Sequence, residues 1–265
     1  SPFGSVSHSH ADQNAFAILK GGRALAIPSG YYGPAYGMPH HADWTRQTKA
    51  NNCILVNGQG QVVRDPQAQG RLREFRHQRA ITYVCGDAAA AYGGKLRRFE
   101  RHVLFLRPGV FLVLDELAAP EAAEFSWLLH AFDKMRLDPA AGAVVSTRGG
   151  ASLEIRLHSE AGLSFHQTDA FDTPYNEGNP PEYHEQVANQ WHFTARTERK
   201  LVETRIAAVM VVRGPGDDFS IEWLRRPDAL GVALKSPQGS GEAWVSPKIT
   251  ARWRSASGQQ EEFTL

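Results

Sequence analysis

The sequence predicts an all-β protein, folded as an antiparallel two-sheet β-sandwich. Three observations support this class. Short apolar runs recur along the 265 residues, Gly- and Pro-rich turns separate them, and segment 152–158 alternates strictly between apolar and polar residues. The one faintly helical stretch is 86–92 (GDAAAAY), which is too short to form more than a turn or two.

The clearest elements are hairpins. Runs 15–19 and 24–27 flank the turn KGG and predict the first hairpin; a helix from Asp12 competes on propensity, but the glycine pair would end it. Runs 102–106 and 110–114 flank RPG, where Pro-Gly at the central positions predicts a type II turn. Further strands are predicted at 54–56, 125–129, 152–158, 191–195, 205–212 and 221–224.

The predicted elements divide into a main β-sandwich over residues 1–200 and C-terminal strands over 201–265. The C-terminal strands either complete the sandwich or form a small β subdomain. Segment 172–185, rich in Pro, Gly and Asn, is a long loop that either binds a ligand or merely connects strands. Alternation along the strand sends the side chains of Asp115 and Glu116 to opposite faces, so we interpret this pair as a strand end.

Composition excludes several classes of function. The net charge of +1 and the lack of a Lys/Arg run argue against nucleic-acid binding, and no apolar run is long enough to span a membrane. Cys53 and Cys85 lie in apolar runs and are expected to be buried and unpaired. Because the chain lacks an initiator methionine and a signal peptide, we expect a fragment or a processed form.

The first polar cluster is the SHSH stretch near the amino terminus. Residues i and i+2 of a strand share a face, so His8 and His10 would project together, next to the polar run that contains Gln13. Such a pair could hold a metal or serve acid–base or electrostatic catalysis. Alternatively, it is a solvated strand end.

A second cluster lies in the Gly/Pro-rich segment 29–52. Tyrosine and tryptophan faces stack on sugar rings, while arginine and histidine meet carboxylates or sulfates. The segment therefore predicts an aromatic, mildly cationic cleft for an acidic sugar. With Gln13, the predicted substrate-binding residues are Tyr31, Tyr32, His40, His41, Trp44 and Arg46.

These clusters also carry a family resemblance. The motifs SPFGSVSHSHADQNAF, LAIPSGYY, PHHADWTRQTKANNCILVNGQGQ and YVCGDAAAAYGGKLRRFERHVLFLRPGVFLVLDEL resemble the heparinase II/III-like polysaccharide lyases. The likeness is greatest to their exo-acting oligoalginate and heparin-type members, and it continues more weakly through FSWLLHA and QWHFTA. The resemblance implies the C-terminal β-sandwich of such a lyase, without the family's N-terminal α/α toroid.

The resemblance also implies a reaction and roles for two residues. These lyases break a glycosidic bond by β-elimination, in which a base removes the C5 proton of a uronic acid and an acid protonates the leaving oxygen. His8 occupies the position of the family's histidine that neutralises the substrate carboxylate. Tyr36 is the best match to the tyrosine that acts as base in some members, with Tyr31 and Tyr32 as rivals.

The sequence departs from the family at its structural zinc. Of the three family ligands only His10 is retained, because Pro28 and Asn51 occupy the other two positions. Zinc generally needs at least three protein ligands, so we predict no metal and no cofactor, although His40, His41 or Asp43 could substitute. His102, His130 and His192 lie in predicted strands and are expected to be packing or strand-surface residues.

The leading hypothesis is the C-terminal part of a lyase for uronate-containing glycans of the alginate or heparin/heparan type. Its expected partners are an acidic polysaccharide or oligosaccharide and the N-terminal toroid of the same protein, with no nucleic acid and no membrane. The family suggests a periplasmic or secreted location. The alternatives are a non-catalytic glycan-binding module that uses the same aromatic loop, or a structural sandwich that supports the toroid.

Overall fold

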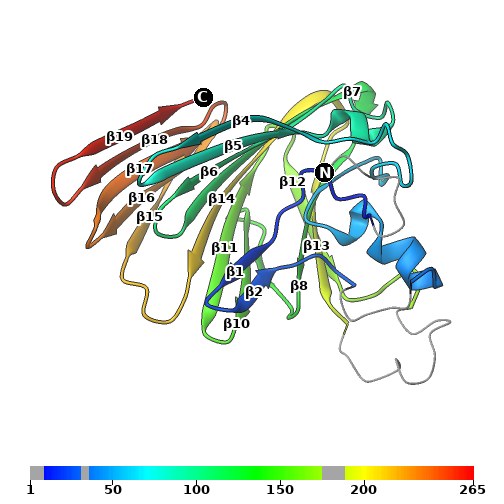
Figure 1. Ribbon diagram of the computed structural model, residues 1–265, viewed down its shortest axis with the longest axis horizontal. Helices are drawn as coiled ribbons and strands as arrows, with labels where there is room; N and C mark the ends of the chain where they lie inside the picture. The colour runs from blue at the N-terminus through cyan, green and yellow to red at the C-terminus, as the bar shows by residue number, and fades with distance from the viewer. Residues whose placement is uncertain (1–8, 31–35, 175–188) are drawn as a thin grey trace.

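The chain folds into three stacked antiparallel β-sheets (Figure 1). The computed structural model describes residues 9–30, 36–174 and 189–265. Strands make up 55% of the residues and helices 6%, so the all-β antiparallel class is confirmed. A third sheet adds to the two that were expected.

An eight-stranded sheet forms the middle layer. Its strand order is β4-β5-β6-β7-β14-β11-β10-β9, and every neighbouring pair is antiparallel. In chain order these strands are β4 (Arg71–His77), β5 (Ile81–Asp87), β6 (Arg98–Leu106), β7 (Val110–Ala123), β9 (Arg136–Asp138), β10 (Ala143–Arg148), β11 (Ala151–His158) and β14 (Leu201–Arg213).

Two smaller sheets cover the two faces of this middle layer. One has the order β12-β13-β8-β3 and consists of β3 (Ile54–Val56), β8 (Phe125–Ala131), β12 (Leu163–Thr168) and β13 (Trp191–Thr197). The other runs in chain order through β15 (Ser220–Arg226), β16 (Ala229–Ser236), β17 (Gly239–Val245), β18 (Thr250–Ser255) and β19 (Gln260–Thr264).

Alternation along the middle strands builds two separate hydrophobic cores. In β14, Ile206, Ala208 and Met210 pack into the core shared with the four-stranded sheet. Between them, Ala207 and Val209 pack into the core shared with the five-stranded sheet. Because both faces of the central strands β7 and β14 are buried, each contains a run of consecutive apolar residues.

The C-terminal segment 201–265 contributes to two layers. β14 lies between β7 and β11 in the middle sheet, whereas β15 to β19 form the whole of the third sheet. Three of those five strands pack on the middle layer: β16 and β17 contact β7, β11 and β14, and β19 contacts β5.

The remaining elements are short. β1 (Ile18–Lys20) and β2 (Arg23–Ala26) form the first predicted hairpin, which is confirmed. A five-residue π-helix η1 (His41–Thr45) and two 3-10 helices, η2 (Thr48–Ala50) and η3 (Ala89–Tyr92), complete the described chain. No helix in residues 9–30, 36–174 or 189–265 is long and apolar enough to cross a membrane.

The second predicted hairpin, β6–β7, is confirmed, but its turn is not of type II. That turn needs a positive φ at its second central residue, and Gly109 does not have one. A different constraint requires glycine there, because a Cβ would lie 2.5 Å from the backbone oxygen of Val212.

The interpretation of Asp115 and Glu116 as a strand end is wrong. Both lie inside β7, and Asp115 is completely buried. Its carboxylate pairs with the guanidinium of Arg101 on β6 through contacts of 2.6 and 2.8 Å. A buried charge needs a partner, and the partner of Asp115 lies on the neighbouring strand. The residues next to Asp115 in the sequence therefore did not reveal the pair. Cys53 and Cys85 are buried and free, as predicted.

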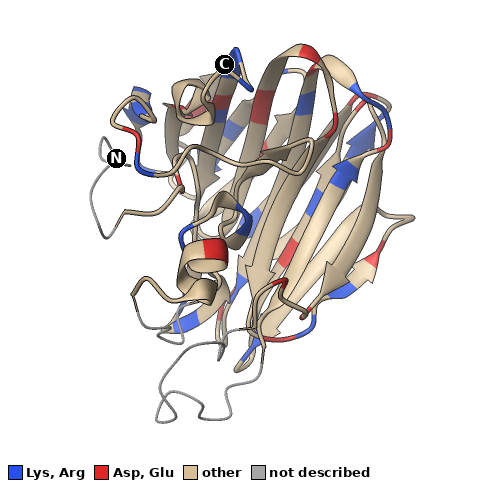
Figure 2. Cartoon of the chain, turned by 90° about the vertical axis from the view of Figure 1, so that its right-hand side faces the viewer, with Lys and Arg blue, Asp and Glu red and all other residues tan. Residues whose placement is uncertain are grey.

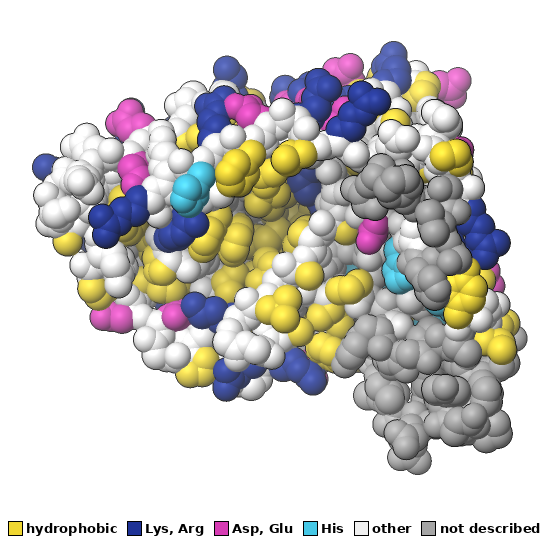
Figure 3. Space-filling model, in the orientation of Figure 1, with side chains coloured by type: hydrophobic (Ala, Val, Ile, Leu, Met, Phe, Trp, Pro, Cys, Tyr) yellow, Lys and Arg dark blue, Asp and Glu magenta, His cyan; other side chains and the backbone are white. Residues whose placement is uncertain are grey.

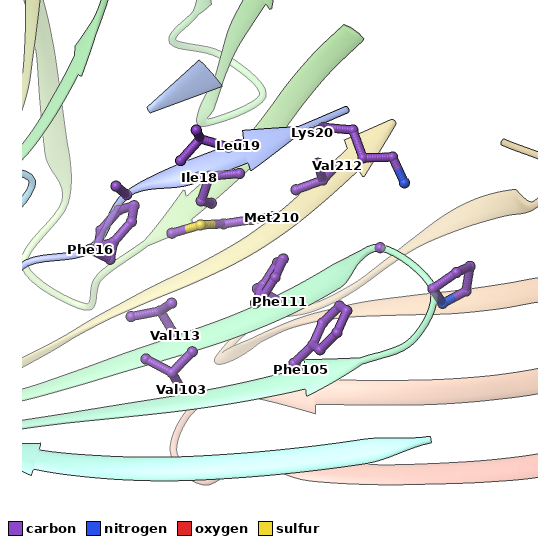
Figure 4. Close-up of a pocket in the computed structure, with 13 residues that line it drawn as sticks. Phe16, Ile18, Leu19, Lys20, Val103, Phe105, Phe111, Val113, Met210 and Val212 are labelled. Atoms are coloured by element: carbon purple, nitrogen blue, oxygen red, sulfur yellow. The ribbon is translucent and has the colours of Figure 1, made fainter. Parts of the chain in front are cut away.

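One face of the middle sheet is hollowed and apolar beside the β1–β2 hairpin (Figure 3). A groove of about 250 Å³ lies there between β1 and the strands β6, β7 and β14. Phe105, Phe111 and Met210 point into it, with Ile18 and Leu19 from β1 on the opposite side (Figure 4).

Candidate functional site

The candidate site is built on the segment that follows β2 and carries η1 and η2, at one end of the long axis (Figure 1). Backbone hydrogen bonds fix this segment to the sheets: Ile27 N donates to His130 O, and Ser29 N donates to Ala50 O. Ala11 N donates to Arg46 O at 2.8 Å, which holds the amino-terminal segment against η1. The fold therefore brings residues near position 10 and residues 36–46 together.

Four polar or aromatic side chains meet there. The rings of Tyr36 and His41 lie 4.9 Å apart between centroids, and the His10 ring lies 6.3 Å from that of His41. The guanidinium carbon of Arg46 is 5.9 Å from the centre of the Tyr36 ring. Gly37 N donates to His41 Nδ1, so His41 also braces the loop that carries Tyr36.

Arg46 is the most unusual member of this group. Its side chain is buried, with 3% of the residue exposed. Within the described residues, its Nε and one terminal nitrogen are buried and have no hydrogen-bond partner. A buried guanidinium with unpaired N–H groups is costly unless an anion satisfies it. Arg46 is therefore placed to bind a carboxylate or a sulfate.

Burial also sets the charge states of the neighbouring amino-terminal residues. It lowers the pKa of His10, and Arg46 lowers it further, against the opposing effect of the Asp12 carboxylate. Burial likewise raises the pKa of Asp12. Both shifts favour the neutral forms, and a neutral imidazole can accept a proton.

Trp44 lies beneath this group as a packing residue. It is 7% exposed, and its ring lies 4.4 Å from His192 and 5.0 Å from Phe171. Its Nε1 donates to Ser29 Oγ at 3.0 Å, and Ser29 Oγ lies 3.3 Å from His192 Nε2. Trp44 thus supports the site from below.

His40 belongs to the same aromatic layer. It is completely buried, its ring lies 4.7 Å from Phe171, and its Nδ1 donates to the Thr173 carbonyl at 2.7 Å. Burial lowers its pKa. This contact ties η1 to the start of the long loop that follows β12.

His130 and His192 complete this layer from two paired strands, β8 and β13, where they lie directly opposite each other. Burial lowers the pKa of His130 to about 3, with a further effect of His192. Burial also lowers the pKa of His192 to about 4. Their packing role was predicted from the sequence. Their position next to Trp44 was not predicted, because their contacts with Trp44 and Ser29 span long sequence separations. The histidines in FSWLLHA and QWHFTA were the available signal.

The other predicted site residues lie elsewhere or outside the described chain. Gln13 is buried beside Gly70, and its backbone exchanges hydrogen bonds with the Gln61 side chain. Its role in substrate binding stays a prediction. His8, Tyr31 and Tyr32 lie outside the residues that the structure describes.

Pro28 and Asn51 stand at the two positions where the family resemblance implies further zinc ligands. Asn51 donates its side-chain amide to Gln47 O. Across residues 9–30, 36–174 and 189–265, the one group of three potential metal ligands is Glu100, His102 and Glu116, which does not include His10. Arg98 contacts both glutamates and Arg205 contacts Glu116, so positive side chains already neutralise this group. We assign it to an ion-pair network.

The electrostatic character of the site is local. Figure 2 views the side that carries η1 and η2, and basic and acidic residues are interspersed over the described chain. The positive charge at the site thus comes from Arg46, and not from a broad basic surface. Together, Arg46, the surrounding imidazoles and the phenol of Tyr36 can bind an anionic group and hold or transfer a proton.

Comparison with known proteins identifies the fold and the family. The sequence model described as "Heparinase II/III-like, C-terminal" matches residues 1–244. Among solved structures, the heparan sulfate lyase HepC from Pedobacter heparinus superposes with a TM-score of 0.62 at 15% identity, covering 97% of this chain and 37% of that one.

A structure titled "Crystal Structure of Heparinase III" gives a TM-score of 0.62 at 14% identity, covering 98% of this chain and 37% of that one. The chain thus spans less than two fifths of either enzyme. A search of curated proteins found no match. On the family match over residues 1–244, this chain belongs to the heparinase II/III-like family, of which it represents the C-terminal part.

Proposed function

We propose that this chain is the C-terminal β-sheet part of a polysaccharide lyase that cleaves uronate-containing glycans by β-elimination. The observation that carries the proposal is the buried guanidinium of Arg46, with two unpaired nitrogens beside Tyr36. The heparan sulfate lyase and heparinase III among the structural neighbours favour a heparin or heparan substrate over alginate. The proposed location is periplasmic or secreted.

The reaction makes three demands on the site. A base removes the C5 proton, the electrons of that bond form a C4–C5 double bond, and the bond from C4 to the glycosidic oxygen breaks. Negative charge develops on the C5 carboxylate, so a hydrogen-bonding cation there stabilises the transition state. The leaving oxygen then needs a proton from an acid.

We assign the stabilisation of the carboxylate charge to Arg46, helped by His8, and the removal of the C5 proton to Tyr36. Arg46 presents a planar donor set, which suits a carboxylate better than a lysine does. Tyr36 is 46% exposed, so its phenol can reach a bound sugar as base or acid. His10, held neutral by burial, is available to accept a proton.

Substitutions in the complete enzyme test these roles. Arg46→Gln and Tyr36→Phe should each lower kcat by roughly 10²–10³-fold, which is typical for the loss of one transition-state donor. Arg46→Lys should recover only part of the loss, because it restores charge without the bidentate geometry. Formation of unsaturated uronate, followed by ultraviolet absorbance, is the measurement.

The control is Arg252→Gln on β18, an exposed arginine outside the site, which should leave kcat unchanged. A well-folded Arg46→Gln enzyme with near-normal kcat would refute the assignment. If the complete protein binds acidic oligosaccharides through Arg46 but releases no unsaturated product, the alternative of a glycan-binding module is correct.

A further inference from the structure

A large cavity lies at the end of the molecule away from the candidate site. It has a volume of about 690 Å³ and is bounded by the β4–β5, β6–β7, β16–β17 and β18–β19 turns. The third sheet and the helices η1 and η2 lie at opposite ends of the molecule's long axis (Figure 1). A ligand here would therefore bind independently of Arg46.

Aromatic rings form one side of this cavity. Trp253 on β18 and Phe105 on β6 both line it. The indole packs against β17, where a Cβ at Gly239 or Gly241 would come within 2.8 Å of the Trp253 ring. Trp253 is 6% exposed and belongs to the core, so only a small part of its ring faces the cavity, beside the partly exposed ring of Phe105.

Two guanidinium groups supply positive charge. Arg79 and Arg107 both line the cavity, and neither pairs with a carboxylate in the part of the chain that the structure describes. Arg107 donates to Thr82 Oγ1, and its guanidinium carbon lies 4.9 Å from the centre of the Phe105 ring. Both arginines are available to an anion.

The one carboxylate in the lining is already engaged. Glu261 accepts hydrogen bonds from the backbone nitrogens of Ala80 and Ile81 at 2.8 and 3.2 Å. Neutral donors and acceptors fill the rest of the polar lining. They are Gln238, Ser255, Ser257 and Gln259.

We propose that this cavity is a non-catalytic binding site for a carboxylated or sulfated sugar residue. The partly exposed Phe105 ring and the accessible part of the indole suit the apolar face of a pyranose. The amides and hydroxyls suit its closely spaced hydroxyl groups, and the two guanidiniums suit its anionic group. An acidic peptide shares the charge but lacks the cluster of hydroxyls. The volume lies within the usual range for small-molecule sites.

The test separates this cavity from the candidate active site. In an Arg46→Gln background, the protein is titrated calorimetrically with a sulfated uronate tetrasaccharide, a neutral glucose tetrasaccharide and a tetraglutamate peptide. Adding Arg79→Gln with Arg107→Gln should weaken binding of the sulfated tetrasaccharide about tenfold or more, since charge-assisted hydrogen bonds are strong. The neutral sugar and the peptide should bind much more weakly than the sulfated one.

The matched control is Arg225→Gln with Arg254→Gln, two exposed arginines of the third sheet that do not line the cavity. It should change the Kd by less than twofold. Arg79→Glu, at an exposed position, provides a second variant if the double substitution destabilises the fold. Any of three results would overturn the proposal. They are loss of all binding in the Arg46→Gln background, an equal loss of affinity in the control, and equal affinity for the neutral sugar or the peptide.

Discussion

His130 and His192 remain uncharged at neutral pH because both are buried against each other and against Trp44. Their ring centroids lie 5.4 Å apart, so a charge on one would oppose a charge on the other. Burial lowers the pKa of His192 to about 4 and that of His130 to about 3. The aromatic layer under the site therefore depends on neutral imidazoles.

This arrangement predicts acid-sensitive stability. As pH falls through about 6.5, the unfolded chain takes up protons at these histidines, whereas the folded protein does so only near pH 4 and below. The contribution of His192 is thus complete above pH 6.5 and is lost progressively down to pH 4. The loss amounts to roughly 3 kcal/mol, at about 1.4 kcal/mol per pKa unit.

Urea unfolding at pH 7 and pH 5 measures this effect. His192→Phe should reduce the difference in unfolding free energy between the two pH values, because the aromatic ring fills the space without titrating. His77→Gln, at an exposed position on β4, is the control and should leave the difference intact. An unchanged difference in His192→Phe would show that other groups cause the acid sensitivity.

At the scale of residues, the sequence located part of the candidate site. Tyr36, His41 and Arg46 come together because they lie within one short segment of the chain. The layer beneath them was not predicted, because Phe171 and His192 reach Trp44 only through the pairing of distant strands. The sequence also predicted that Trp44 stacks on a sugar, but its side chain is buried and packs inside the protein.

At the scale of elements, the Arg101–Asp115 pair joins the site segment to the middle sheet. Arg101 on β6 binds Asp115 on β7 and also donates to the backbone oxygens of Asn14 and Asn52. One buried guanidinium thus holds the segment that follows His10 and the segment that leads into β3. Its loss would disturb both elements.

We predict a large asymmetry between single and double substitutions of this pair. Arg101→Met leaves the Asp115 carboxylate buried without its partner and should destabilise the fold by about 3–5 kcal/mol. Arg101→Met with Asp115→Leu should recover part of that loss, because no charge remains buried. Thermal and urea unfolding measure both variants.

Recovery should be incomplete, since the carbonyls of Asn14 and Asn52 lose their donor in either variant. The exposed pair Arg252–Glu262 on β18 and β19 is the matched control, and its removal should cost less than about 1 kcal/mol. If the double variant is no more stable than Arg101→Met, then the backbone contacts of Arg101, and not the buried charge, dominate.

The sequence predicted strands well where one face is polar or a glycine turn marks the end. β11 alternates cleanly, and the β1–β2 and β6–β7 hairpins follow their turns. It missed β4, whose sequence RLREFRH is mostly charged because the strand lies at the edge of the middle sheet. It also missed most of the third sheet, where glycines interrupt β16 and β17 and polar residues dominate β19.

At the scale of the whole molecule, the third sheet covers the second face of the central strands of the middle layer. Val113 and Leu117 of β7 pack on one core, while Leu112 and Leu114 pack on the other. Consecutive apolar residues in VFLVLDEL and RIAAVMVV were the sequence signal for two covered faces. A two-sheet sandwich would leave half of these side chains exposed to water.

The two cores also determine whether the isolated chain can fold. They give it the buried surface needed to fold without further domains, so the isolated 265-residue chain should show a cooperative thermal transition and a β-type circular dichroism spectrum. Arg46 and Tyr36 are both present, and binding of acidic oligosaccharides should persist. Weakened binding in Arg46→Gln would show that the candidate site is formed.

Turnover by the isolated chain should nevertheless be very low. The chain spans 37% of the structurally similar lyases, and the proposed function places further catalytic groups on the remainder. Because catalytic groups act as a set, losing some of them removes most of the rate. Ultraviolet assays should detect little unsaturated uronate from the isolated chain, and much more from the complete enzyme at equal concentration. Equal rates from both would mean that this chain holds all of the catalytic groups. The groups that act with Arg46 and Tyr36 would then have to lie within the β-sheet part.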